Sequence, residues 1–140
     1  MGYAGPWQQF MEQSLISQFV PFRSPRFADL PRQAESLAFA RRLWRRLLPV
    51  ANPRIIVCLG REVQKELKQL LFEHVNAVNI TEQSYPTGWG NYQAEITVLS
   101  NAEKAVRLLY LPHLSTWTLF TSEKCRANMP AILEAIARDA

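Results

Sequence analysis

The sequence predicts a three-layer α/β/α sandwich with a mainly parallel central sheet, and three observations support this fold class. Helix-like and strand-like stretches alternate along the 140 residues. A continuous apolar run over residues 55–59 lies between Pro53 and Gly60, which is typical of a strand buried on both faces. Apolar residues then recur at helical spacing over residues 63–71, with charged residues between them. A strand, a glycine turn and an amphipathic helix in this order indicate an α/β sheet.

Length and composition are those of an ordinary globular chain. A single domain over residues 1–140 can bury a core without disulfides or metal. The formal charge of +4 and the pI near 9.4 favour an anionic partner such as DNA. Cys58 and Cys125 form no CxxC pair, so we expect a reducing, cytoplasmic setting. No apolar run approaches membrane-spanning length and no nucleotide or zinc motif occurs, so we expect no membrane partner, cofactor or metal.

The first half of the chain is expected to hold a short strand between two helices. A short helix over residues 7–15 leads into a strand that ends near Phe22. After a loop, a longer helix begins near Pro31, and Pro49, Asn52 and Pro53 end it. The apolar stripe of this helix consists of Leu37, Ala40, Leu43, Trp44, Leu47 and Leu48, and it is flanked by Arg41, Arg42, Arg45 and Arg46.

The second half is expected to alternate strands and turns before a final helix. In order, we expect a strand over residues 75–80, a loop or wide hairpin turn over 81–92, a strand over 94–98, a polar turn over 101–104 and a strand over 105–111. The final helix runs from Ser122 to Ala137, and Pro130 must kink or restart it. Its expected inward-facing residues are Ile132, Leu133 and Ile136.

His113 is the most specific candidate for chemistry. It follows a predicted strand and Pro112, and Ser115 is nearby, so it should lie in a loop at the carboxyl end of that strand. Ligand contacts in open α/β sheets come from such loops. The alternative is an ordinary surface histidine after a strand.

Arginines and one tryptophan are candidates for nucleic-acid contact. The four arginines of the long helix repel one another at helical spacing, so they either contact phosphate or form a solvated face. Arg23 and Arg26, in a proline-containing loop, are better placed for a phosphate. Trp89, between two glycines, either stacks on a base or fills a gap beneath its loop.

The order of these pieces, over about residues 15 to 138, resembles the uracil-DNA glycosylase superfamily. The likeness consists of Pro-Phe-Arg (21–23), an arginine-rich helix, Asn-Pro-Arg-Ile-Ile-Val-Cys-Leu-Gly (52–60) and His-Leu-Ser (113–115) before a last helix. The last of these looks like the second active-site motif of the family, commonly His-Pro-Ser, with Leu114 in place of proline. The resemblance implies a DNA-binding, glycosylase-like fold.

In that family a flipped base is removed while a donor stabilises the departing anion, and the resemblance gives this role to His113. The adjoining loop inserts into DNA, which makes Leu114, Ser115, Thr116 and Trp117 candidate DNA contacts. The base would be bound by Gln18, at a place where the family usually has asparagine, and by Trp7, as a stacking residue. The family's water-positioning motif, which precedes all these pieces, has no counterpart here.

Three functions remain open on the sequence. The chain is a DNA-binding glycosylase-like domain with weak or no excision activity, an active glycosylase that uses His113, or a small α/β interaction or ligand-binding module whose likeness is only of fold. Because the family strand that carries the missing motif is central to its sheet, we also expect a rearranged sheet or a homodimer that covers a sheet edge.

Overall fold

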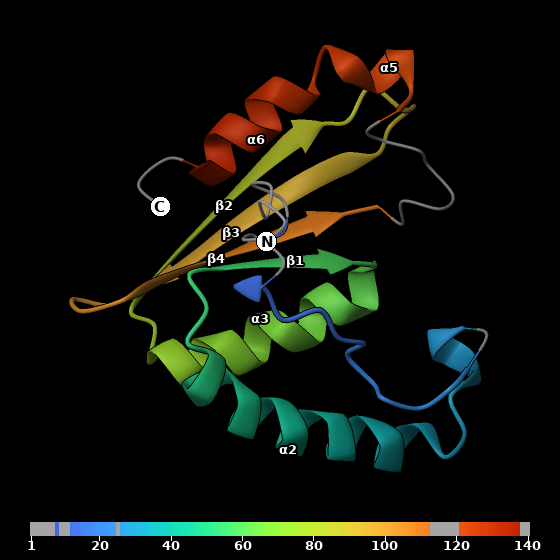
Figure 1. Ribbon diagram of the computed structural model, residues 1–140, viewed down its shortest axis with the longest axis vertical. Helices are drawn as coiled ribbons and strands as arrows, with labels where there is room; N and C mark the ends of the chain where they lie inside the picture. The colour runs from blue at the N-terminus through green and yellow to red at the C-terminus, as the bar shows by residue number, and fades with distance from the viewer. Residues whose placement is uncertain (1–7, 9–11, 25, 113–120, 138–140) are drawn as a thin grey trace, which may run out of the picture. The chain divides into compact units, whose positions relative to one another are not determined.

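The computed structural model describes residues 8, 12–24, 26–112 and 121–137. The chain divides into two compact units, residues 1–42 and 43–140. The elements, labelled in Figure 1, are the 3₁₀ turn η1 (Phe27–Asp29), α2 (Gln33–Ala51), β1 (Ile55–Leu59), α3 (Arg61–Val75), β2 (Asn79–Pro86), β3 (Gln93–Ser100), β4 (Ala105–Leu111), α5 (Glu123–Arg126) and α6 (Met129–Ala137).

The sheet of the second unit is mixed, with the strand order β1-β4-β3-β2. Only β1 and β4 run parallel, from Ile55 opposite Arg107 to Leu59 opposite Leu111, while the β2–β3 and β3–β4 pairs are antiparallel. The expectation of a mainly parallel three-layer sandwich is therefore wrong. The reason is the length of the connections, because residues 87–92 and 101–104 are too few for the crossover that parallel strands require.

Helices pack on both faces of this sheet (Figure 1). α3 contacts β1, β3 and β4 on one face, where its buried residues are Gln64, Leu67, Leu70, Leu71 and Val75. On the other face, α5 and α6 form a core with β3 and β4 that consists of Ala94, Ile96, Leu109, Leu111, Cys125, Met129 and Ile132. The alternation of side chains along β3 and β4 supplies both cores.

β1 is an edge strand, and only one of its faces is buried. Cys58 is buried on the α3 face, whereas Ile55, Val57 and Leu59 are exposed on the other face. The expectation of a strand buried on both faces is wrong for residues 55–59. A continuous apolar run indicates burial on both faces only where both faces are covered, and α5 and α6 leave this part of the sheet open.

Several expected boundaries move. Val75 ends α3, and Asn76 follows it in a left-handed conformation with φ of 50°. The strand expected over 75–80 therefore starts later, and β2 continues to Pro86 through residues expected to form a loop. α2, in contrast, ends at Ala51, within the stretch from Pro49 to Pro53 that was expected to end it. Residues 13–24 form no strand, so the short strand expected before Phe22 is wrong.

The last strand and the final helical stretch agree closely with the prediction from the sequence. β4 has the expected bounds of 105–111. The final helical stretch is broken into α5 and α6, and Pro130 is the second residue of α6, so the expected restart is confirmed. Ile132 is buried as expected, whereas Leu133 is exposed.

Candidate nucleic-acid interface

The site residues predicted from the sequence and from the family resemblance fall into two groups. Six of them lie outside the described residues, namely Trp7, His113, Leu114, Ser115, Thr116 and Trp117. The other three, Gln18, Arg23 and Arg26, are exposed side chains of the first unit. The residues that the structure does describe therefore include the expected phosphate contacts, while the expected catalytic histidine stays a prediction.

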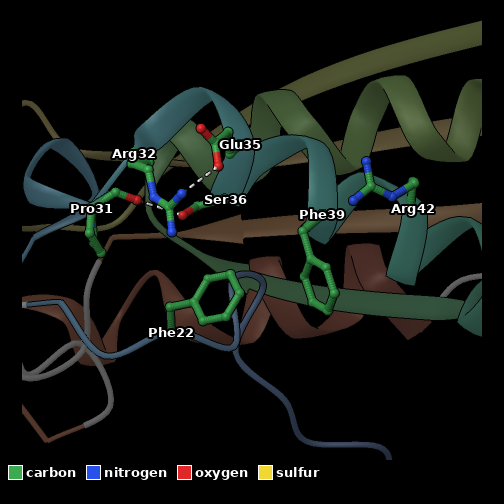
Figure 2. A pocket seen from close by; sticks show the side chains of 7 residues that line it. All are labelled: Phe22, Pro31, Arg32, Glu35, Ser36, Phe39 and Arg42. Carbon is green, nitrogen blue, oxygen red and sulfur yellow. Dashed lines mark hydrogen bonds and ion pairs between the residues drawn. The ribbon is translucent and has the colours of Figure 1, made fainter.

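A pocket of about 360 Å³ lies within the first unit and is drawn in Figure 2. We call it the Phe22–Phe39 pocket, and its lining residues are Phe22, Pro31, Arg32, Glu35, Ser36, Phe39 and Arg42. Phe22 comes from the segment before η1, and Pro31 and Arg32 immediately precede α2. The remaining residues project from the first three turns of α2, so a regular helix positions most of the lining.

Two half-exposed phenylalanines form the apolar part of this pocket. The ring centroids of Phe22 and Phe39 are 5.4 Å apart and the rings are tilted by 45°, as Figure 2 shows. Each residue is 41% exposed. Two adjacent aromatic rings that keep this much surface in water offer exposed apolar ring faces, which are the type of surface on which planar ligands stack.

At the start of α2, the polar side chains that line the pocket make hydrogen bonds and an ion pair with neighbouring residues. Ser36 Oγ donates a hydrogen bond to the carbonyl of Pro31 at 2.7 Å. Arg32 pairs with Glu35 at 3.3 Å between Nη1 and Oε2, so the two charges offset each other. The backbone N–H groups of Glu35 and Ser36 both donate to the carbonyl of Arg32. Ser36, Arg32 and Glu35 therefore already have partners within the protein.

Arg42 supplies the unneutralised charge. Its guanidinium has no hydrogen bond or ion pair with any residue that the structure describes, and neither do those of Arg23 and Arg26. Residues 21–42 contain five arginines and two acidic residues, so this segment carries +3 of the formal charge of +4. Most of the net positive charge of the chain therefore lies in the segment that supplies the residues of the pocket.

Phe39 was missed by the sequence reasoning, although a signal for it exists. It lies outside the apolar stripe of α2, and it shares a helix face with Glu35 and Arg42, four residues before and three residues after it. An amphipathic helix normally keeps large aromatic residues on its apolar stripe. A phenylalanine among charged residues on such a helix indicates a surface used for contact.

Arg45, also on α2, behaves differently from Arg42. Arg45 donates two hydrogen bonds to the carboxylate of Glu73 in α3, at 2.9 and 3.3 Å. These bonds hold the pKa of Glu73 below its usual value. Arg45 thus has a partner within the second unit and forms an ion pair between α2 and α3.

Trp89 belongs to the core of the second unit. It is partly buried against the α5–α6 core, and Lys124 Nζ lies 5.4 Å from its ring centroid. Of the two alternatives for this residue, the structure favours the one in which the ring fills space beneath its loop. The Gly88-Trp89-Gly90 segment is therefore a packing feature of the turn between β2 and β3.

A polar cluster lies beside Gly60, at the carboxyl ends of β1 and β4. Arg61 pairs with Glu95 at 2.5 Å, and Gln64 donates to the same carboxylate at 2.9 Å. The Arg61 guanidinium also lies 4.2 Å from the ring centroid of Tyr110. Every member of the cluster thus interacts with another member, so the cluster holds α3 to the sheet.

The ionisation of this cluster agrees with a structural role. Burial raises the pKa of Glu95, but the hydrogen bonds from Arg61 and Gln64 outweigh it and bring the pKa below its usual value. Burial raises the pKa of Tyr110. The pair Glu95–Arg61 is therefore charged and the phenol of Tyr110 neutral at physiological pH.

Comparisons with known protein families, with curated proteins and with solved structures found no match to this chain. The resemblance to uracil-DNA glycosylases therefore stays a prediction. In the part of the chain that the structure describes, no helix is both long enough and apolar enough to cross a membrane. The same residues contain no group of three or more histidine, cysteine or acidic side chains placed to hold a metal ion.

Proposed function

We propose that the chain binds nucleic acid through the Phe22–Phe39 pocket and prefers unpaired nucleotides. The observation that supports this most directly is the exposed pair of phenylalanine rings beside the unneutralised guanidinium of Arg42. Aromatic rings that stack on bases and arginines that contact phosphate are the two parts from which single-strand binding surfaces are built. A duplex offers its phosphates but keeps its base faces stacked.

The ring geometry determines how a base would bind. Phe22 and Phe39 already contact each other, so a base stacks on the solvent side of one ring and not between them. Stacking on one aromatic side chain contributes about 1 to 3 kcal/mol per base. Arg42 comes one turn after Phe39 on α2, and Arg23 directly follows Phe22, which gives each ring a neighbouring arginine for a phosphate.

Fluorescence anisotropy with a labelled single-stranded oligonucleotide and its duplex tests this proposal. We expect tighter binding to the single strand. Phe39→Ala should weaken binding at least about fivefold, because about 1 kcal/mol or more of stacking is lost. Single-strand affinity that is unchanged in Phe39→Ala, or undetectable at low salt, would contradict the proposal.

Salt dependence separates the arginines. Arg42→Gln should weaken binding and reduce the slope of log affinity against log salt by about 0.7, the value for one phosphate contact on a single strand. Arg54→Gln is the matched control, because Arg54 is exposed, belongs to the second unit and has a side chain with no partner among the described residues. If both variants lose the same affinity, the effect is one of overall charge and the pocket is not the site.

The family resemblance adds a narrower proposal, in which the domain binds DNA with weak or no base excision. His113 would carry any excision that occurs. Incubation with oligonucleotides containing uracil or other damaged bases, followed by cleavage at abasic sites, measures this activity. Excision that His113→Ala abolishes would establish the active glycosylase instead. The homodimer and the cytoplasmic location expected from the sequence also stay predictions.

A further inference from the structure

The outer edge of β1 is an unpaired strand edge made of apolar residues. Ile55, Val57 and Leu59 are 37%, 54% and 36% exposed. Their parallel partners on β4 include Leu109 and Leu111, which are buried under α5 and α6 on the same face of the sheet. The exposed stripe on β1 thus continues the apolar face of the core to the edge of the sheet. Figure 1 shows β1 at this edge, beside β4.

The backbone of β1 offers its outward hydrogen-bonding groups at alternate residues. Arg107 N–H donates to the carbonyl of Arg54 at 2.9 Å, and Gly60 N–H donates to the carbonyl of Leu111 at 3.4 Å. Residues 54 and 60 therefore point toward β4, and the odd-numbered residues between them point outward. These outward residues are Ile55, Val57 and Leu59. No strand formed by the described residues pairs with them.

The two edges of the sheet differ in how they are protected. β2, the opposite edge, carries Glu82, which pairs with Lys68 at 2.8 Å, and it ends in Pro86. Charged residues and prolines on an edge strand are the usual protection against pairing with another chain. β1 has neither charge nor proline over residues 55–59. An uncharged apolar edge of this kind is typical of a strand that is covered by a partner.

We propose that β1 pairs antiparallel with β1 of a second copy, about a two-fold axis at Val57. In this register Val57 lies opposite Val57 of the partner subunit, and Ile55 lies opposite Leu59 of the partner subunit. Because residues 55, 57 and 59 all direct their backbone groups outward, each of these pairs exchanges two hydrogen bonds. The two four-stranded sheets then form one continuous sheet.

The partner that best fits the free edge of β1 is β1 of a second copy, because the strand is complementary to itself. Antiparallel pairing about Val57 sets apolar residues opposite apolar residues on both faces, and it places no like charges opposite each other. Pro53, at the next outward position, has no N–H and limits the ladder to β1. A two-fold interface needs one surface to match itself, and β1 meets this requirement.

Sedimentation velocity over protein concentrations from about 1 μM to about 1 mM tests the proposal, since a short strand edge buries little area and gives a reversible dimer. The wild-type chain should shift from monomer to dimer across this range. Val57→Glu places two carboxylates opposite each other at the axis and should stay monomeric throughout. Ile80→Glu, at an exposed position on β2, is the matched control and should still dimerise. Circular dichroism checks that both variants fold.

Cross-linking tests the register. In a hydrogen-bonded antiparallel pair the two Cα atoms are about 5.5 Å apart, which suits a disulfide. Val57→Cys should therefore give a covalent dimer on mild oxidation, while Ile55→Cys, which faces Leu59, should not. The wild-type chain, whose two cysteines are buried, gives the background. A wild-type chain that is monomeric at about 1 mM, or a dimer that Val57→Glu leaves intact, would overturn the proposal.

Discussion

Lys104 joins three elements of the second unit through one ammonium group. Its Nζ lies 2.7 Å from Asn52 Oδ1 and 2.6 Å from His74 Nε2. The ammonium donates both hydrogen bonds, so His74 can accept one only as neutral imidazole with its proton on Nδ1. Burial and the charge of Lys104 hold the pKa of His74 below its usual value of 6.5. Protonation of this ring therefore disrupts a contact that ties α3 to the start of β4.

This arrangement predicts a pH dependence of stability. Because His74 binds protons more weakly in the folded than in the unfolded chain, the free energy of unfolding should fall as pH drops below about 6.5, until the folded-state pKa is passed. The loss should stay below about 1 kcal/mol, since the ring is partly solvated. Urea unfolding between pH 7.5 and 5 measures it.

His74→Gln provides the control for this prediction, because its amide oxygen can still accept from Lys104 but does not titrate. The difference between the two unfolding free energies should change with pH only below about 6.5. If wild type and variant lose stability in parallel, the pH dependence comes from other groups and not from His74.

The turn between β2 and β3 depends on Gly88. Thr87 is buried, and both its Oγ1 and its N–H donate to the carbonyl of Tyr92, at 2.8 and 3.1 Å. Gly88 has φ of +85°, and a Cβ there would lie against the Lys124 carbonyl and 2.6 Å from Asn128 Nδ2. The turn therefore packs directly on the backbone of α5, and a side chain at this position has no space.

Gly88→Ala should lower the free energy of unfolding by about 2 to 4 kcal/mol, from left-handed strain together with overpacking. Gly90→Ala is the matched control in the same turn, because Gly90 has φ of +52° but no atom within 4 Å of the added Cβ. It should cost only about 1 kcal/mol. Equal losses in chemical denaturation would show that the turn does not pack closely on α5.

At the scale of the elements, the sequence predicts regular, strongly patterned segments well. The strand at 105–111 and the break at Pro130 are both confirmed. Most of β2, residues 81–86, was assigned to a loop or wide hairpin turn because the sequence of the strand, Asn-Ile-Thr-Glu-Gln-Ser-Tyr-Pro, is polar at most positions. An edge strand exposed on most of its surface lacks the apolar alternation by which strands are recognised.

For the whole molecule, the main error of the prediction was the direction of the strands. The lengths of the connections between strands contain the information that would have corrected it. The four residues at 101–104 were assigned to a turn, but their consequence for the directions of β3 and β4 was not drawn.

The candidate site was predicted only in part. Arg23 and Arg42 were identified by their charge, whereas Phe39 was not, because pairing with Phe22 depends on a contact across 17 positions of the chain.

The rate at which Cys58 is alkylated reports how often β1 separates from the rest of the second unit. Burial raises the pKa of its thiol to about 12, so roughly one molecule in 10⁵ carries the reactive thiolate at pH 7. Alkylation of Cys58 therefore requires β1 to separate from β4 and α3. Labelling with iodoacetamide, followed by peptide mass spectrometry to distinguish Cys58 from Cys125, should be slow and should accelerate in mild denaturant. Labelling as fast as that of the unfolded chain would show that β1 is only loosely held.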